Sequence, residues 1–220
     1  MSDDDKRLAA EAAMAEVCDG MLVGLGTGST VAFAIAALIR ARRRIETVAT
    51  SEDSAAKARR GGLTVRDFAN VSRVDLTIDG ADEIDPHLRA IKGAGGALLR
   101  EKIVAAASDR MIVIADGSKR VAALGVAKLP VEVLPFARTF ASMRLAALGA
   151  TVERRGGPTD NGNIILDAHF GAIADPAALA LAIAEVPGVL GHGLFLDEVD
   201  AAYIAEKGVV TRLERGRASG

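Results

Sequence analysis

The segment from Met21 to Ile39 has the sequence MLVGLGTGSTVAFAIAALI. It begins with a short apolar run, Met21–Leu25, and continues through a glycine-rich loop, Gly26–Thr30. Beyond the loop, apolar residues follow the spacing of one face of a helix, at Val31, Ile35, Leu38 and Ile39. The segment therefore predicts a strand, a glycine loop and a helix in succession.

The loop Gly26–Thr30 has features of an anion-binding site. In this order of elements, several backbone N–H groups and the positive end of the helix point to one spot. Three loop residues add hydroxyl groups, namely Thr27, Ser29 and Thr30. We expect a cradle for a phosphate or carboxylate group here, and the alternative is a tight turn that only joins the two elements.

Four more short apolar runs indicate further strands, at Ile45–Ala49, Leu63–Val65, Val74–Ile78 and Met111–Ala115. Each run is continuous rather than alternating, which is typical of a parallel sheet with both faces covered. We predict an α/β fold with a Rossmann-like, mainly parallel sheet covered by helices. In such a sheet, ligands bind beyond the carboxyl ends of the strands.

The second half of the chain has a different order of elements. From Val131 to Phe195 the pattern predicts strand, helix, strand, strand, helix, strand, which is the ferredoxin-like order. Two last strands, Ala201–Ala205 and Val209–Leu213, are expected to return to the first domain. We therefore predict a Rossmann-like catalytic domain at 1–128 plus 200–220, with an inserted ferredoxin-like α+β domain at 129–199.

The segment Thr77–Lys102, TIDGADEIDPHLRAIKGAGGALLREK, gathers charged residues around a glycine run. Asp79 and Asp82 follow a predicted strand, and Lys92 precedes the glycines. Glu101 is three residues after Leu98 on the next helix, which puts it near the edge of the buried face, where a general base is plausible. The alternative is a charged loop followed by a surface glutamate that pairs with a neighbouring basic residue.

Composition limits the possible functions. The 220 residues are half apolar, and the net charge of −2 argues against a nucleic-acid partner. The single cysteine, Cys18, is expected to be a small buried residue and points to a reducing compartment. Acidic residues at Asp3–Asp5 and the lack of a long uncharged run favour a cytoplasmic protein with no membrane contact. The three histidines lack ligand spacing, so no metal site is expected.

Six motifs in order resemble the ribose-5-phosphate isomerase type A family across nearly the whole chain. They are GLGTGST (24–30), TIDGADEID (77–85), IKGAGGALLREKIVA (91–105), ADGSK (115–119), LPVEVLP (129–135) and TDNGNIILD (159–167). The resemblance implies an aldose–ketose isomerase of the pentose phosphate pathway that interconverts ribose 5-phosphate and ribulose 5-phosphate without a metal or organic cofactor. It also implies a homodimer or homotetramer.

The same resemblance implies residue roles. Glu101 would be the base, Lys92 would stabilise the oxyanion, and Asp79 and Asp82 would bind hydroxyls and help to open the furanose ring. Further residues would hold the sugar phosphate, namely Thr27, Gly28, Ser29, Thr30, Gly80, Ala81, Gly93, Ala94, Gly95 and Lys119. Lys6 also matches a family lysine, but its neighbours do not.

Two other classes of function compete with this one. A sugar-phosphate sensor on the same fold would keep the Gly26–Thr30 cradle but would not need Glu101 and Lys92 together. A nicotinamide-dependent oxidoreductase would need a third glycine where Ser29 or Val31 stands, and a clear ribose-binding acid after the second strand.

Overall fold

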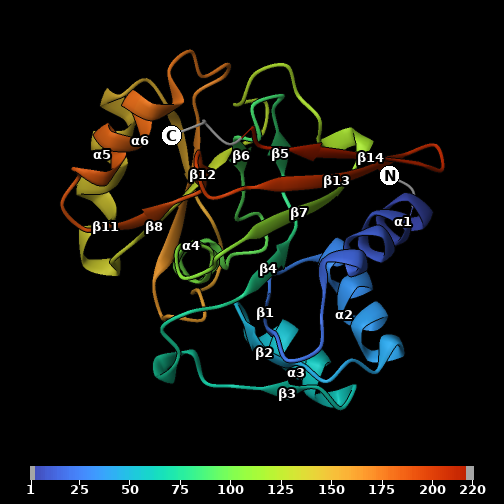
Figure 1. The fold of residues 1–220 in the computed structure, drawn as a ribbon. Helices are drawn as coiled ribbons and strands as arrows, with labels where there is room; N and C mark the ends of the chain where they lie inside the picture. The colour runs from blue at the N-terminus through green and yellow to red at the C-terminus, as the bar shows by residue number, and fades with distance from the viewer. Residues whose placement is uncertain (1–2, 217–220) are drawn as a thin grey trace. The chain divides into compact units, whose positions relative to one another are not determined.

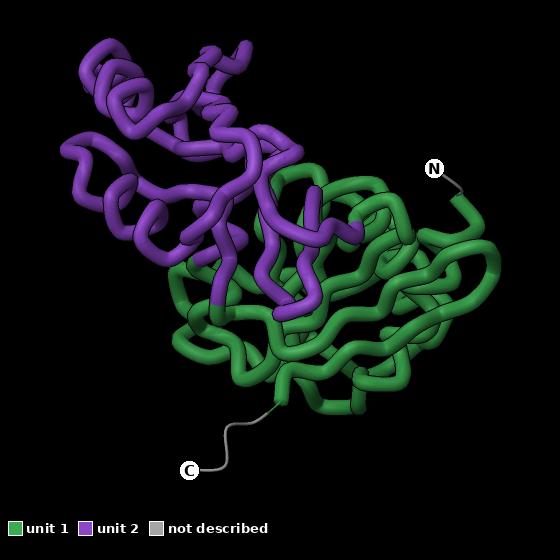
Figure 2. The backbone as a smooth tube through the Cα atoms, turned by 90° about the horizontal axis from the view of Figure 1, so that it is seen from above, with its two compact units in different colours: residues 1–81, 103–119, 197–220 green, residues 82–102, 120–196 purple. Residues whose placement is uncertain are grey.

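The computed structural model describes residues 3–216 of the chain. These residues form two compact units (Figure 2). Of the described residues, unit 1 comprises 3–81, 103–119 and 197–216, and unit 2 comprises 82–102 and 120–196. The domain division that we predicted, 1–128 plus 200–220 and 129–199, stays a prediction.

Unit 1 contains a seven-stranded sheet with the order β14-β13-β7-β4-β1-β2-β3 (Figure 1). Its strands are β1 (Leu22–Leu25), β2 (Glu46–Ala49), β3 (Thr64–Val65), β4 (Leu76–Asp79), β7 (Met111–Asp116), β13 (Ala201–Glu206) and β14 (Val209–Glu214). Neighbouring strands are parallel except for β13 and β14. The predicted mainly parallel sheet is confirmed, and so is the return of the last two strands to it.

Helices cover both faces of this sheet. α1 (Asp3–Ala13), α2 (Ser29–Ala41) and α3 (Glu52–Arg60) contribute to one core with side chains of β1, β4, β7 and β13. On the other face, Val104 of α4 (Leu98–Ala106) packs with Val48 and Val74. A Cβ at Gly24 of β1 would lie 2.1 Å from Thr77 Oγ1 and 2.9 Å from Val104, so only glycine leaves room for this helix.

Unit 2 contains an antiparallel four-stranded sheet with the order β11-β8-β10-β9. Its elements are β8 (Leu129–Val133), α5 (Arg138–Ala147), β9 (Thr151–Arg154), β10 (Ile164–His169), α6 (Pro176–Ala184) and β11 (Val189–His192). The predicted ferredoxin-like order is confirmed. Val131 and Val133 face the core that the sheet shares with α5 and α6.

The last strand of the predicted order, which reaches Phe195, is not a single element. It is divided into β11 and β12 (Leu194–Phe195), and β12 joins a second sheet with β6 (Ala90–Ile91) and β5 (Glu83–Ile84). The chain passes from the first sheet to the second at Gly193, because the Gly193 N–H donates to Pro130 O of β8 while its carbonyl accepts from Lys92 N next to β6. A Cβ there would lie 2.1 Å from Lys92 O.

Cys18 is exposed, which corrects the expectation of a buried thiol. The first helix, α1, ends at Ala13, and the chain continues as the 3-10 turn η1 (Met14–Glu16). Val17 therefore takes the buried position, and Cys18 follows it into the turn before β1. Other 3-10 turns are η2 (Phe68–Asn70), η3 (Gly117–Lys119) and η4 (Pro135–Ala137). Within residues 3–216, no helix has the length and apolarity needed to span a membrane.

A cluster of charges in unit 1 ties η1 to the sheet. Glu16 accepts hydrogen bonds from Tyr203 Oη at 2.8 Å, from Arg110 Nε at 3.1 Å and from Arg212 Nη2 at 3.1 Å. Burial alone would raise the pKa of Glu16, but the hydrogen bonds from these residues outweigh it and hold the pKa below its ordinary value. The folded protein thus favours the charged form of Glu16.

Replacing Glu16 with Gln should lower the free energy of unfolding by about 1.5–3 kcal/mol at pH 7, the range for hydrogen bonds to charged groups. Since the pKa is lower in the folded state, this contribution is complete above the unfolded value of about 4.3 and is lost as the pH falls through the folded value. Urea unfolding at pH 7 and pH 3 measures it. Glu11→Gln, which removes an exposed pair with Arg40, is the control and should cost less than about 1 kcal/mol. An equal effect of Glu16→Gln at both pH values would contradict a role for its charge.

Candidate active site

In unit 1, the glycine loop and the end of β4 are held together by Asp79. This carboxylate is fully buried, and its Oδ1 accepts from Thr27 N at 3.1 Å and from Gly80 N at 2.7 Å. A Cβ at Gly26 would lie 1.8 Å from the same oxygen. Gly26 is therefore required for the carboxylate to lie against the loop, and the two predicted motifs meet.

The loop leads into α2 as the sequence predicts. Gly28 is the N-cap of α2, with φ of 112°, a conformation that favours glycine. Thr27 also forms a hydroxyl–hydroxyl contact of 3.0 Å with Thr50, whose own hydroxyl donates to Leu25 O. Gly28 and Ser29 are exposed, while Thr27 and Thr30 are half-buried. The first turn of α2 thus offers N–H groups and hydroxyls that a bound anion can reach.

Two further residues of unit 1 lie where β7 ends. Lys119, in η3, is half-buried. Asp116 is buried, and its Oδ1 accepts from Ser118 N at 3.0 Å. Within residues 3–216, its Oδ2 has no hydrogen-bond partner. We did not predict Asp116, although the rule that singled out Asp79 at the end of β4 applies equally to the next strand in the sheet.

In unit 2, Lys92 and Glu101 form a buried ion pair. Lys92 Nζ lies 3.4 Å from Glu101 Oε2, and the side chains are 2% and 3% exposed. Lys92 Nζ also lies 5.3 Å from the centroid of the Phe195 ring. The spacing from Leu98 predicted that Glu101 lies near the edge of the helix's buried face. The structure instead places Glu101 inside the protein. The surface alternative for Glu101 is wrong.

The glycine run between these two residues is held at its start by Asp82 and Arg155. Asp82 Oδ2 accepts from Ala94 N at 2.9 Å. Arg155 Nη1 donates to Gly93 O at 2.8 Å and to Ala94 O at 3.0 Å, and its guanidinium pairs with Asp167. Gly93 is buried with φ of 107°, whereas Ala94 and Gly95 are exposed. The exposed part of this loop offers backbone N–H groups next to Asp82.

Three other charged residues of the Thr77–Lys102 segment have structural contacts. Glu83 is buried and accepts from the N–H groups of Gly125 and Ala127. Asp85 accepts from His87 N and pairs with Arg89. Lys102 Nζ donates to Leu194 O at 2.6 Å.

Other predicted residues are placed more simply. Gly80 and Ala81 follow β4 and are half-buried. Lys6 is buried in α1, and its Nζ donates to Asp3 Oδ1 at 3.2 Å. Among residues 3–216, no group of three or more His, Cys, Asp or Glu side chains is arranged to hold a metal ion.

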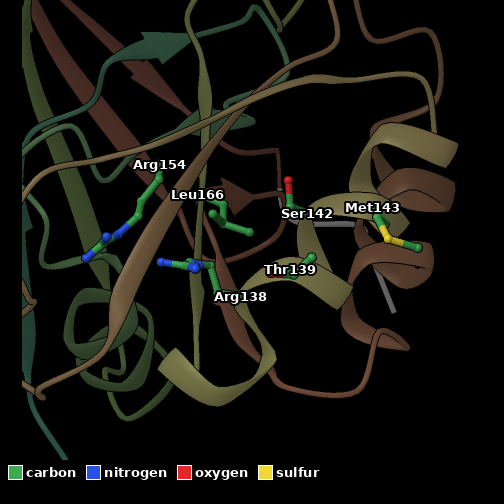
Figure 3. Close-up of a pocket in the computed structure, with 6 residues that line it drawn as sticks. All are labelled: Arg138, Thr139, Ser142, Met143, Arg154 and Leu166. Atoms are coloured by element: carbon green, nitrogen blue, oxygen red, sulfur yellow. The ribbon is translucent and has the colours of Figure 1, made fainter.

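A hollow of about 350 Å³ in unit 2 contains none of the predicted site residues. Figure 3 shows its lining, formed by α5, β9 and β10: Arg138, Thr139, Ser142, Met143, Arg154 and Leu166. This hollow therefore does not include the Asp79 cluster of unit 1 or the Lys92–Glu101 pair of unit 2.

Comparison with known proteins gives consistent matches. Residues 46–208 match the family model of ribose 5-phosphate isomerase A (phosphoriboisomerase A). Ribose-5-phosphate isomerase A of Sphingopyxis alaskensis is 54% identical over 97% of each chain. The crystal structure of ribose 5 phosphate isomerase A from Neisseria gonorrhoeae has a TM-score of 0.95, with 38% identity over 99% of each chain. A structure of D-ribose-5-phosphate isomerase in complex with phospho-erythronic acid has a TM-score of 0.93 and 35% identity, covering 98% of this chain and 100% of that one.

The mixed α/β fold and these matches define an isomerase. The buried lysine–glutamate pair belongs to the motifs that carry the sequence resemblance, IKG and REK. The chain belongs to the ribose 5-phosphate isomerase A family.

Replacing Gly26 with Ala should destabilise the protein by about 1–3 kcal/mol, the usual cost of overpacking, because the new Cβ would displace the Asp79 carboxylate. Gly80→Ala is the matched control, since a Cβ there has no atom nearer than 3.8 Å. Urea unfolding of both variants measures the difference. Equal stabilities would show that Asp79 moves freely and that the loop does not depend on Gly26.

Proposed function

We propose that this chain interconverts ribose 5-phosphate and ribulose 5-phosphate in the pentose phosphate pathway, with Glu101 as the general base. In the aldose-to-ketose direction, Glu101 removes the proton from C2 of the open-chain sugar. The electron pair forms a C1–C2 double bond, and the C1 carbonyl oxygen becomes an enediolate oxygen. Glu101 returns the proton to C1 while the O2 proton passes to O1, so atoms and charge balance.

The observation that supports this proposal is the buried pair of Lys92 and Glu101, whose charged atoms lie 3.4 Å apart. A base and a cation are the two groups that this reaction needs. General acid–base catalysis supplies about 10²- to 10⁴-fold, and losing one oxyanion donor costs about 10²- to 10³-fold. We propose that Lys92 stabilises the oxyanion. A sugar-phosphate sensor would have no use for this pair, and burying it would only cost stability.

Other residues are assigned to binding. We propose that Asp79 and Asp82 bind sugar hydroxyls and carry the proton of ring opening. We propose that five residues bind the substrate, its phosphate included: Thr27, Gly28, Ser29, Thr30 and Lys119. Backbone groups of five more residues would also contact the substrate: Gly80, Ala81, Gly93, Ala94 and Gly95. The exposed first turn of α2 supports the phosphate assignment. The phospho-erythronic acid named in a related structure supports the enediolate of the proposed reaction, since a carboxylate beside a hydroxyl resembles an enediolate.

Glu101→Gln should reduce turnover of ribose 5-phosphate to less than about a hundredth of the wild-type rate, because the amide matches the carboxylate in shape but does not accept the proton. Formation of the ketose without added cofactor measures turnover, and ligand titration checks that substrate still binds. Glu185→Gln, at an exposed position after α6, is the control.

Two results would overturn this assignment. A folded wild-type protein that forms no ketose would remove the isomerase function itself. A Glu101→Gln variant that keeps more than about a hundredth of the activity would leave the function and remove Glu101 as the base.

We also propose that the chain forms a homodimer or homotetramer and works in the cytoplasm. Several exposed apolar side chains of unit 2 lie on neighbouring stretches of the chain, on η4 and α5 and on the residue that follows β8, and one lies on β11: Leu134, Phe136, Phe140, Met143 and Leu190. Large exposed apolar side chains that lie together usually mark a contact with another protein surface. The free, exposed thiol of Cys18 supports a reducing compartment.

Phe136→Asp should shift the chain toward monomers, because this fully exposed ring would otherwise be buried between copies. Sedimentation velocity over a range of concentrations measures the shift. Val126→Asp, which changes an exposed valine outside this group, should leave the mass unchanged. An unchanged mass for both variants would exclude this surface as the contact.

A further inference from the structure

Glu132 is a buried carboxylate that the proposed chemistry does not use. It lies on β8 of unit 2 with no exposed surface, between Val131 and Val133. Those two valines face the core with α5 and α6, so the alternation of a strand turns Glu132 to the opposite face. On that face, a Cβ at Gly191 of the neighbouring strand would lie 3.1 Å from Leu99 of α4. Glu132 therefore lies on the sheet face that supports the start of α4.

One oxygen of Glu132 collects three hydrogen bonds from a single loop. Its Oε1 accepts from Thr159 Oγ1 at 2.9 Å, from Asn161 Nδ2 at 3.0 Å and from Asn163 Nδ2 at 2.9 Å. Within residues 3–216, its Oε2 has no hydrogen-bond partner. An apolar residue would fill this position at no cost in desolvation, so the carboxylate calls for an explanation other than stability.

Asn161 extends this network to the helix that carries Glu101. Its amide oxygen accepts from Arg100 Nε at 2.8 Å, while its amide nitrogen donates to Glu132. Arg100 Nη2 also donates to Asp160 O at 2.9 Å. Both ends of the Asn161 amide are thus engaged, and Arg100 is bonded to Glu101 through the backbone of α4.

We infer that Glu132 is a positioning residue, which fixes the first turn of α4 through Asn161 and Arg100 and so holds Glu101 beside Lys92. The inference rests on the proposed role of Glu101 as the base. α4 begins at Leu98, only two residues after the glycine run, where Gly93 and Gly96 have positive φ angles. A start of this kind fixes the helix poorly by itself, and a misplacement of about 1 Å at a catalytic group can cost about 10²-fold in rate.

The test compares Asn161→Ala with Asn163→Ala. Each variant removes one donor from Glu132 Oε1, but only Asn161 also reaches Arg100. Asn161→Ala should lower kcat for ribose 5-phosphate by about ten- to a hundredfold with KM changed less than about twofold, while Asn163→Ala lowers kcat by less than about threefold. Arg100→Ala should match Asn161→Ala. The double variant Arg100→Ala/Asn161→Ala should have a kcat no lower than that of the slower single variant, because both changes break the same connection between Glu132 and α4.

Thermal unfolding of each variant separates positioning from a loss of folded protein. Arg100→Ala leaves all three donors of Glu132 in place, so it keeps the inference testable if Asn161→Ala folds poorly. Equal losses of kcat in Asn161→Ala and Asn163→Ala would overturn the inference, and so would single effects that multiply in the double variant. If Glu101→Gln is inactive but Asn161→Ala keeps full kcat, only the positioning role fails. If Glu101→Gln is active, Glu101 is not the base, and the positioning inference that rests on this role fails with it.

Discussion

A charge inside a protein costs several kcal/mol unless protein groups replace the water that it loses. This constraint shapes both units. Asp79 is held by the N–H groups of Thr27 and Gly80, and Glu83 by those of Gly125 and Ala127. Each of these carboxylates joins segments that are distant in sequence, so the loops around it follow from its need for donors.

The fold was largely predictable because its signals are local. Continuous apolar runs that end in polar residues indicated a parallel sheet with covered faces, and its seven strands agree. The prediction failed where a distant partner decides the outcome. Gly193 divides one apolar run into strands of two sheets through contacts with Pro130 and Lys92, and neither contact has a signal near Gly193 in the sequence. Cys18 was misplaced because η1 ends the helix early and Val17 fills the core.

The sequence indicated that Lys92 and Glu101 lie near each other, but it did not indicate how deeply the pair is buried. Motifs placed Lys92 and Glu101 near each other, whereas helical spacing alone left Glu101 at the edge of the buried face. Phe195 adds the missing cover over Lys92, and it comes from a strand about a hundred residues later in the chain. Asp116 could have been singled out by applying the rule on strand ends to one more strand, β7. The bonds of Glu132 required the register of β8 against the Thr159–Asn163 loop, which sequence patterns do not give.

The two kinds of polar group in this molecule call for different surroundings. A group that binds a phosphate, as we propose for the first turn of α2, can lie on an exposed turn, since the ligand brings its own charge. A base that moves a proton between adjacent carbons must keep its position through the whole reaction, which exposed side chains do poorly. Glu101, the base that we propose, meets this requirement because it is buried on a helix whose first turn is bonded, through Arg100 and Asn161, to a strand of a closed core. On the roles that we propose, the stability given up to bury Glu132 is the cost of a rigid support for Glu101.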